Sequence, residues 1–167
     1  KVVVGTTLKD VSGAVYKVST ENTVAYQKPA KKSVVKVVIP PTVTTNGTTF
    51  IVSSVSKNAF AGCTKLKSVT IGKNVTSIGD KAFYNCKSLQ KITIPAKVTK
   101  IGKQAYANCK KMKLITIKSS KLTAKSVGSK AFKGIYKKPT VKVPKKKKKV
   151  YKKMLIAKGV PKKVKIK

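Results

Sequence analysis

Arginine, histidine and tryptophan do not occur in this sequence of 167 residues, and only three residues are acidic: Asp10, Glu21 and Asp80. With no histidine and with acids far apart in the sequence, the chain lacks the residues for a carboxylate pair, a nucleophile–base couple or a metal cluster. No glycine-rich stretch has the spacing of a phosphate-binding loop. The sequence therefore predicts a protein that is not an enzyme, with no catalytic residue, metal site or cofactor.

The absence of arginine also bears on binding, because all 40 basic residues are lysines and the net charge is +37. A domain this basic repels itself and attracts polyanions, and the attraction weakens as salt rises. Base readout and bidentate phosphate recognition favour the planar guanidinium, whereas lysine acts as a hydrated point charge. The composition favours diffuse attraction to an anionic polymer or an acidic protein surface. The alternative is a solvated surface that reflects only the composition typical of the source organism.

Long apolar runs are missing too, so the chain has no segment that could cross a bilayer. It opens without an initiator methionine or a signal segment, and we expect a mature or excised part of a longer protein. Hydrophobic residues make up 41% of the chain, which is enough for a globular core.

What the sequence does contain is a repeat. "NAFAGCTKLKSVTIG" (58–72), "KAFYNCKSLQKITIP" (81–95) and "QAYANCKKMKLITIK" (104–118) follow one another at 23 residues, and "KAFKGI" (130–135) follows after 26. Such a period predicts a solenoid of stacked units. In each unit we expect a short turn of α- or 3₁₀-helix at the Ala-aromatic-Cys segment, then a strand, then a turn at "VTSIG" or "VTKIG".

The repeated aromatic and cysteine positions are expected to form the core: Phe60, Cys63, Phe83, Cys86, Tyr106, Cys109 and Phe132. Stacked cysteines would lie about 4.8 Å apart, within reach of a disulfide. However, three is an odd number, neighbouring side chains run parallel, and a zinc site needs four ligands. Ile135 takes the same place in the fourth copy, which favours simple packing.

The strands also suggest a candidate ligand face. Their central threonines point away from the core by the period-two rule and carry lysines beside them. The predicted face consists of Lys67, Thr70, Lys91, Thr93, Lys113 and Thr116. The alternative is that threonine occurs there only because it forms strands well.

The flanking segments differ from the repeats. Residues 1–57 are expected to form a β-rich N-terminal cap with a degenerate repeat and a hairpin turn at Asn46-Gly47. Residues 58–138 are the regular repeats. Residues 139–167 form a lysine-rich C-terminal cap, with a helix between Pro144 and Gly159 and a final strand; all three belong to one structural domain. The lysine run 145–149 is either a nuclear-import-like or nucleic-acid patch or the solvated face of that helix.

The unit "AFxxCxxLxxIxIPxxVxxIGxxAF" resembles the BspA-type leucine-rich repeat of bacterial surface proteins. The resemblance covers residues 58–135, and the flanks are similar to those of such proteins. It implies an α/β leucine-rich-repeat solenoid, strand-rich with short helical turns, an irregular β N-cap and a helix-plus-strand C-cap. It also implies an extracellular or cell-wall-attached bacterial protein with a role in adhesion.

Together, these observations predict a non-catalytic extracellular binding or adhesion module that attaches to an anionic surface such as a wall polymer or acidic glycan. One alternative is a structural building block of a surface layer or filament, formed by self-association. A second is non-specific nucleic-acid binding, for which the chain offers few aromatic side chains outside the predicted core.

Overall fold

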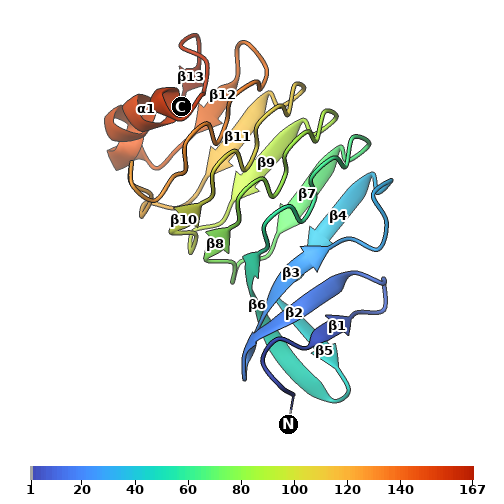
Figure 1. Cartoon of the computed structure of the whole chain (residues 1–167). Coiled ribbons are helices and arrows are strands. Elements are labelled where there is room, and N and C mark those ends of the chain that lie inside the picture. Colours follow the sequence, from blue (N-terminus) through green and yellow to red (C-terminus); the bar gives the residue numbers. More distant parts are fainter. Residues whose placement is uncertain (1) are drawn as a thin grey trace.

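The computed structural model describes residues 2–167 and shows a strand-rich solenoid that carries one α-helix near its C-terminal end (Figure 1). The predicted fold class is confirmed. The strands are β1 (Thr7–Lys9), β2 (Val15–Thr20), β3 (Thr23–Lys28), β4 (Lys36–Ile39), β5 (Thr42–Thr45), β6 (Thr48–Val55), β7 (Ser68–Ile71), β8 (Ser77–Ile78), β9 (Lys91–Ile94), β10 (Lys100–Ile101), β11 (Leu114–Ile117), β12 (Thr140–Lys142) and β13 (Lys165–Ile166).

The strands form two sheets, and the chain passes between them in each turn of the solenoid. One is a six-stranded sheet in the order β13-β12-β11-β9-β7-β4, with parallel neighbours. The other has seven strands in the order β1-β2-β3-β6-β8-β10, with β5 paired to β6. The core lies between the two sheets.

The β-branched repeat strands alternate as predicted. In β7, Val69 and Ile71 are buried, whereas Thr70 between them is exposed; β9 repeats the pattern with Ile92, Thr93 and Ile94. Isoleucine and valine fit a pleated surface that is buried on one face, so each turn adds two such side chains to the core.

The Ala-aromatic-Cys segments are hydrogen-bonded turns, and the prediction of short helical turns there was wrong in its local detail. Each segment contains two residues with positive φ, such as Lys81 (54°) and Asn85 (59°). A left-handed residue interrupts the right-handed backbone that a helix needs. Asparagine or glycine stands at the second of these positions in every copy (Gly62, Asn85, Asn108 and Gly134) because these residues tolerate that conformation.

The segments predicted as turns at 75–79 and 98–102 contain short strands, β8 and β10. Ile78 in β8 pairs with Val55 of β6 and with Ile101 of β10, and all three are buried. A two-residue strand is too short to show an alternating pattern in the sequence. A glycine is needed at position 102, directly after β10, because a Cβ there would clash with the backbone nitrogen of Asp80 in the preceding turn.

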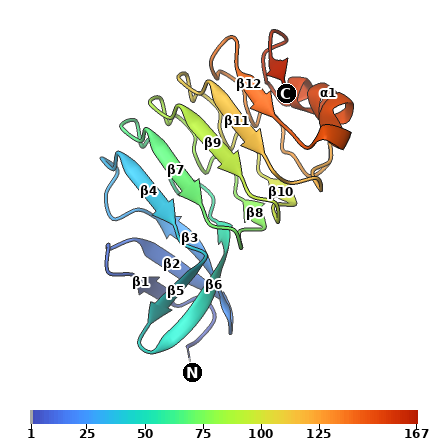
Figure 2. The same cartoon turned by 180° about the vertical axis from the view of Figure 1, so that it is seen from behind.

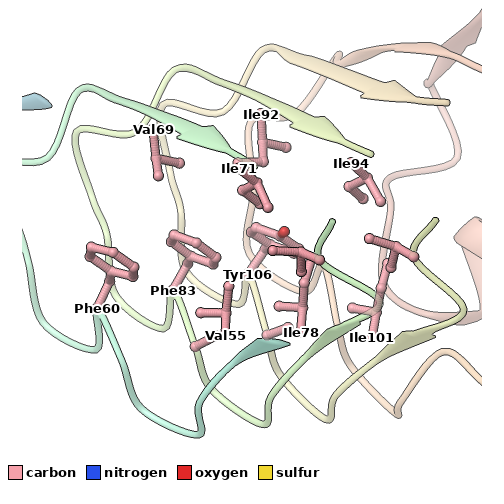
Figure 3. Close-up of a cluster of buried hydrophobic side chains, with 14 of the residues drawn as sticks. Val55, Phe60, Val69, Ile71, Ile78, Phe83, Ile92, Ile94, Ile101 and Tyr106 are labelled. Atoms are coloured by element: carbon pink, nitrogen blue, oxygen red, sulfur yellow. The ribbon is translucent and has the colours of Figure 1, made fainter. Parts of the chain in front are cut away.

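Aromatic side chains stack along the core, parallel to the solenoid axis (Figure 3). Phe60 and Phe83 have ring centroids 4.9 Å apart, Phe83 and Tyr106 5.1 Å, and Tyr106 and Phe132 5.4 Å, with nearly parallel planes. Such close ring pairs add to the stability gained from burying their area.

Each end of the solenoid carries a different structure, as Figure 2 shows. At the N-terminal end β1, β2 and β3 form antiparallel pairs, and β5 and β6 form a hairpin around Asn46-Gly47, as predicted. At the C-terminal end, a 3₁₀ turn (Lys145–Lys147) leads into α1 (Lys148–Ala157), which buries Tyr151, Met154 and Leu155. Among residues 2–167, no helix has both the length and the apolar character needed to cross a membrane.

Candidate functional site

The outer face of the six-stranded sheet is the candidate site, and its side chains are set in rows by the strand register. One row runs across the strands through Lys36, Ser68, Lys91, Leu114 and Thr140, each facing the next. Neighbouring parallel strands lie about 4.8 Å apart, so the rows repeat at that interval. A linear polymer lying across the strands would meet equivalent positions turn after turn.

A second row contains the threonines. Val38 faces Thr70 across β4 and β7, while Thr93 faces Thr116 across β9 and β11. Thr70 and Thr93 are exposed, but Thr116 is half-buried. The hydroxyls therefore become less accessible toward the C-terminal end of the sheet.

A groove with a volume of about 1200 Å³ lies over this face. Thr70, Lys91 and Thr93 line it, so the structure brings together three of the six residues predicted for the ligand face. Thr116 does not line the groove, and neither do Lys67 and Lys113, which precede β7 and β11. The Lys113 ammonium instead lies 5.2 Å from the centre of the Tyr136 ring.

The groove also contains cationic residues that sequence reasoning missed. Besides Lys91, which was predicted, its lysines are Lys36, Lys73, Lys97 and Lys118, and no carboxylate among residues 2–167 lines it. Lys36 could have been found from the likeness of "VVKVVIP" (34–40) to "LQKITIP" (89–95), which aligns it with Lys91. Lys73, Lys97 and Lys118 follow their strands, and only the winding of the chain brings them to one side.

Polar contacts along the edge of the groove are few. Lys97 Nζ donates to Asn74 Oδ1 at 3.2 Å, and the Asn74 amide nitrogen donates to the Pro41 carbonyl oxygen at 3.2 Å. Both bonds join neighbouring turns. Four of the five lysines have no such side-chain bond among residues 2–167 and can meet an anionic ligand.

The predicted core residues lie away from this face. Cys63, Cys86 and Cys109 are free thiols in the buried core. The Cys86 thiol donates to the Phe60 carbonyl oxygen at 3.1 Å, and the Cys109 thiol donates to that of Phe83 at 3.2 Å. Burial raises the pKa of Cys63 to about 11, so this thiol stays protonated and unreactive at neutral pH.

Tyr106 is the unusual member of the aromatic stack. It is fully buried, and its hydroxyl has no hydrogen-bond partner in the part of the chain that the structure describes. Burial raises the pKa of this phenol well above its usual value. Phenylalanine occupies the equivalent place in the other copies, so the hydroxyl has no part in the repeat's architecture.

No metal centre is formed by the residues that the structure describes, since no three His, Cys, Asp or Glu side chains gather in one place there. Asp80 accepts a hydrogen bond from the Lys103 backbone at 2.7 Å, away from the groove. Asp10 accepts from the Ser12 backbone at 2.8 Å and from the Tyr16 hydroxyl at 2.8 Å. Both acids thus serve local structure.

Comparison with known proteins places these features in a family. The BspA type leucine rich repeat region matches residues 33–157 in six copies. A leucine rich cell surface protein from Faecalibacterium prausnitzii has a TM-score of 0.68 and 30% identity over 84% of this chain. A leucine-rich repeat protein from Bacteroides ovatus has a TM-score of 0.68 and 31% identity over 86%.

The chain spans 37% of the length of each of these two structures. A leucine-rich repeat protein from Bacteroides capillosus has a TM-score of 0.63 and 26% identity. The match covers 78% of this chain and 96% of that protein. No protein with curated annotation matches the chain.

Proposed function

Because the chain belongs to the BspA type leucine-rich repeat family, we propose that it is a non-catalytic binding module of a bacterial cell-surface protein. In this proposal it lies outside the cell or on the wall, and the outer face of the six-stranded sheet attaches its parent protein to a linear anionic polymer. The polymer is a wall polymer or an acidic glycan.

The observation that supports this proposal is the groove with five lysines and no carboxylate. Lys36 and Lys91 lie in one row with Ser68 between them, and Lys73, Lys97 and Lys118 line the same groove. Several positive charges along one groove suit a polymer with repeated negative charges. The exposed hydroxyls of Thr70 and Thr93 add short-range hydrogen-bond partners for a sugar. The remaining lysines would speed the encounter without adding selectivity.

Retention on immobilised polyanions over a salt series tests the proposal. The panel holds wall teichoic acid, a sulfated glycan, DNA and a neutral polysaccharide. We expect one wall polymer or glycan to hold the domain at salt that elutes it from the others, and K73E/K91E to abolish that difference. The control K152E/K153E changes the net charge equally on exposed positions of α1 and should keep the difference.

Two results would overturn the proposal. If every polyanion releases the domain at the same modest salt, the charge is generic and a structural role in a surface layer becomes the better explanation. If DNA is retained longest and the neutral polysaccharide not at all, the sheet serves nucleic acid instead.

A further inference from the structure

A ladder of backbone hydrogen bonds joins the Ala-aromatic-Cys turns of successive repeats. The backbone nitrogens of Phe60, Phe83 and Tyr106 donate to the carbonyl oxygens of Ala82, Ala105 and Ala131 at 2.6, 2.7 and 2.8 Å. Two residues further along each turn, Gly62, Asn85 and Asn108 donate to Tyr84, Ala107 and Lys133 at 2.8, 3.0 and 2.8 Å. Each turn thus donates to the turn that follows it, and its own carbonyls face the turn that precedes it.

Among residues 2–167, the turn that contains Ala59 and Ala61 receives no such bonds from the turn before it. By position, the Ala59 and Ala61 carbonyls correspond to those of Ala82 and Tyr84, but no donor among residues 2–167 bonds to either of them. Ala59 is only 4% exposed, and a buried carbonyl normally has a partner. Two acceptors are therefore left open at the N-terminal end of the ladder.

A short connection explains the gap. Tyr26 pairs with Val55, and Lys36 pairs with Ser68, so the two intervening segments are equivalent parts of neighbouring turns. The chain advances thirteen positions from Val55 to Ser68 but only ten from Tyr26 to Lys36. The segment 29–35 between β3 and β4 lacks the residues that would complete a turn, and it begins with Pro29, which has no N–H.

A groove of about 810 Å³ occupies this place. Ala59 and Ala61 line one part of it together with their neighbours in the same turn, and residues of β1, β2, β3 and the 29–32 segment line other parts. Among the described residues, its charged side chains are Lys9, Lys28, Lys31 and Lys32, and none of the carboxylates lines it. A ligand complementary to both the unpaired carbonyl acceptors and the lysines carries N–H donors and negative charge.

We infer that this groove binds an extended acidic peptide segment of a partner protein. The backbone N–H groups of the peptide donate to the Ala59 and Ala61 carbonyls and continue the ladder, in the manner of a strand added to an open edge. Its carboxylates pair with the four lysines. A second copy of this chain cannot take the place, because it has three acidic residues and a net charge of +37. The inference concerns a different surface from the sheet groove and does not depend on it.

The test uses fluorescence anisotropy with the whole domain and a labelled peptide of alternating glutamate and valine. A second peptide has the same sequence but is N-methylated on alternate backbone nitrogens, which removes N–H donors and leaves the charge unchanged. We expect the N-methylated peptide to bind about tenfold more weakly or worse, as the loss of a hydrogen bond predicts. The carbonyl ¹³C resonances of Ala59 and Ala61 should move when the first peptide binds.

Charge variants complete the test. K31E/K32E should weaken binding of the first peptide about tenfold or more by turning attraction into repulsion. K145E/K146E makes the same change of net charge at exposed positions beyond the other end of the solenoid and should alter the affinity less than about twofold, as rim charges do. K73E/K91E, in the sheet groove, should also leave it unaltered.

Equal affinity for the two peptides would overturn the inference, because it would show a site for negative charge alone. Equal losses in K31E/K32E and K145E/K146E would overturn it as well, since the attraction would then be generic. A loss confined to K73E/K91E would assign the peptide to the sheet groove instead.

Discussion

At the scale of single residues, the buried tyrosines show that similar side chains have different energetic roles. The Tyr151 hydroxyl accepts a hydrogen bond from the Leu122 backbone and donates one to the Ser119 carbonyl, both at 3.0 Å. The Tyr106 side chain is also fully buried, but its hydroxyl has no hydrogen-bond partner among residues 2–167. An unpaired buried hydroxyl costs free energy, whereas a paired one contributes to stability.

Replacing Tyr106 by phenylalanine should therefore leave the free energy of unfolding unchanged or raise it by up to about 1 kcal/mol. The Tyr151→Phe variant is the matched control and should lose about 1–2 kcal/mol, because two backbone groups lose their partner. Urea denaturation of both variants measures the difference. A clear loss in Tyr106→Phe would show that its hydroxyl has a partner after all.

Asp10 is the acid with the strongest structural role. Burial alone would raise its pKa, but hydrogen bonds from Ser12, from the Tyr16 hydroxyl and from the Ala14 backbone outweigh this and lower the pKa from its ordinary value. A carboxyl whose pKa is lower in the folded state stabilises the fold above its unfolded pKa. That contribution disappears as the pH falls through the folded pKa.

The Asp10→Ala variant should lose about 1–2 kcal/mol of unfolding free energy at pH 7. The difference in unfolding free energy between this variant and the unchanged protein should shrink as the pH falls below about 4. There Asp10 becomes protonated first in the unfolded state and, at lower pH, in the folded state. Urea denaturation at pH 7, 5, 3 and 2 follows this. Glu21→Ala, at an exposed position, serves as control; a constant gap at every pH would contradict the role assigned to the charge.

At the scale of the elements, the turns set the shape of each repeat through their left-handed residues. Asn85 has a φ of 59°, and glycine stands at the same place in the first and fourth copies with φ of 75° and 77°. The backbone nitrogen of Asn85 also belongs to the ladder between turns. The conformation of one residue thereby controls how two turns meet.

Changing Asn85 to alanine should cost about 1–2 kcal/mol, because alanine pays a steric penalty in the left-handed region. Changing it to glycine should cost little, since glycine adopts that conformation freely. Thermal and urea unfolding of the two variants separates the backbone effect from the loss of the side chain. Equal stability of the alanine and glycine variants would show that the side chain, not φ, matters.

At the scale of the whole molecule, the charge of +37 sets the balance between stability and attraction. Lysines repel one another over the surface, and 3 acidic residues cannot neutralise them. The Debye length falls from about 30 Å at 0.01 M salt to about 10 Å at 0.1 M. The repulsion across a domain of this size is therefore largely screened at moderate salt.

The melting temperature should consequently rise between 0.01 and 0.3 M sodium chloride, by about 2–8 °C if screening recovers about 1–2 kcal/mol. Scanning calorimetry measures it, and potassium chloride at matched ionic strength should give the same curve because the effect depends on ionic strength alone. A melting temperature that does not change with salt would mean that repulsion between the hydrated, widely spaced lysines does not destabilise the folded state.

The sequence alone determined the repeat, the alternation of the strands and the core. Those features are local. Backbone geometry points the Thr70 side chain away from the face that carries Val69 and Ile71, and a 23-residue period makes equivalent residues stack. The turns were predicted wrongly because lysine rarely adopts a positive φ, so the residue type at position 81 does not indicate this conformation. The strands β8 and β10 were not predicted because two residues are too few to show an alternation of buried and exposed side chains.

Only the tertiary structure decided which residues meet at the two grooves. Lys36, Lys73 and Lys118 come from different turns, and their position on one side depends on strand register and winding. The open carbonyls of Ala59 and Ala61 follow from a connection three residues short in the preceding turn. A hydrogen-bond ladder joins residues more than twenty positions apart, so a missing partner appears only when the turns are stacked in space.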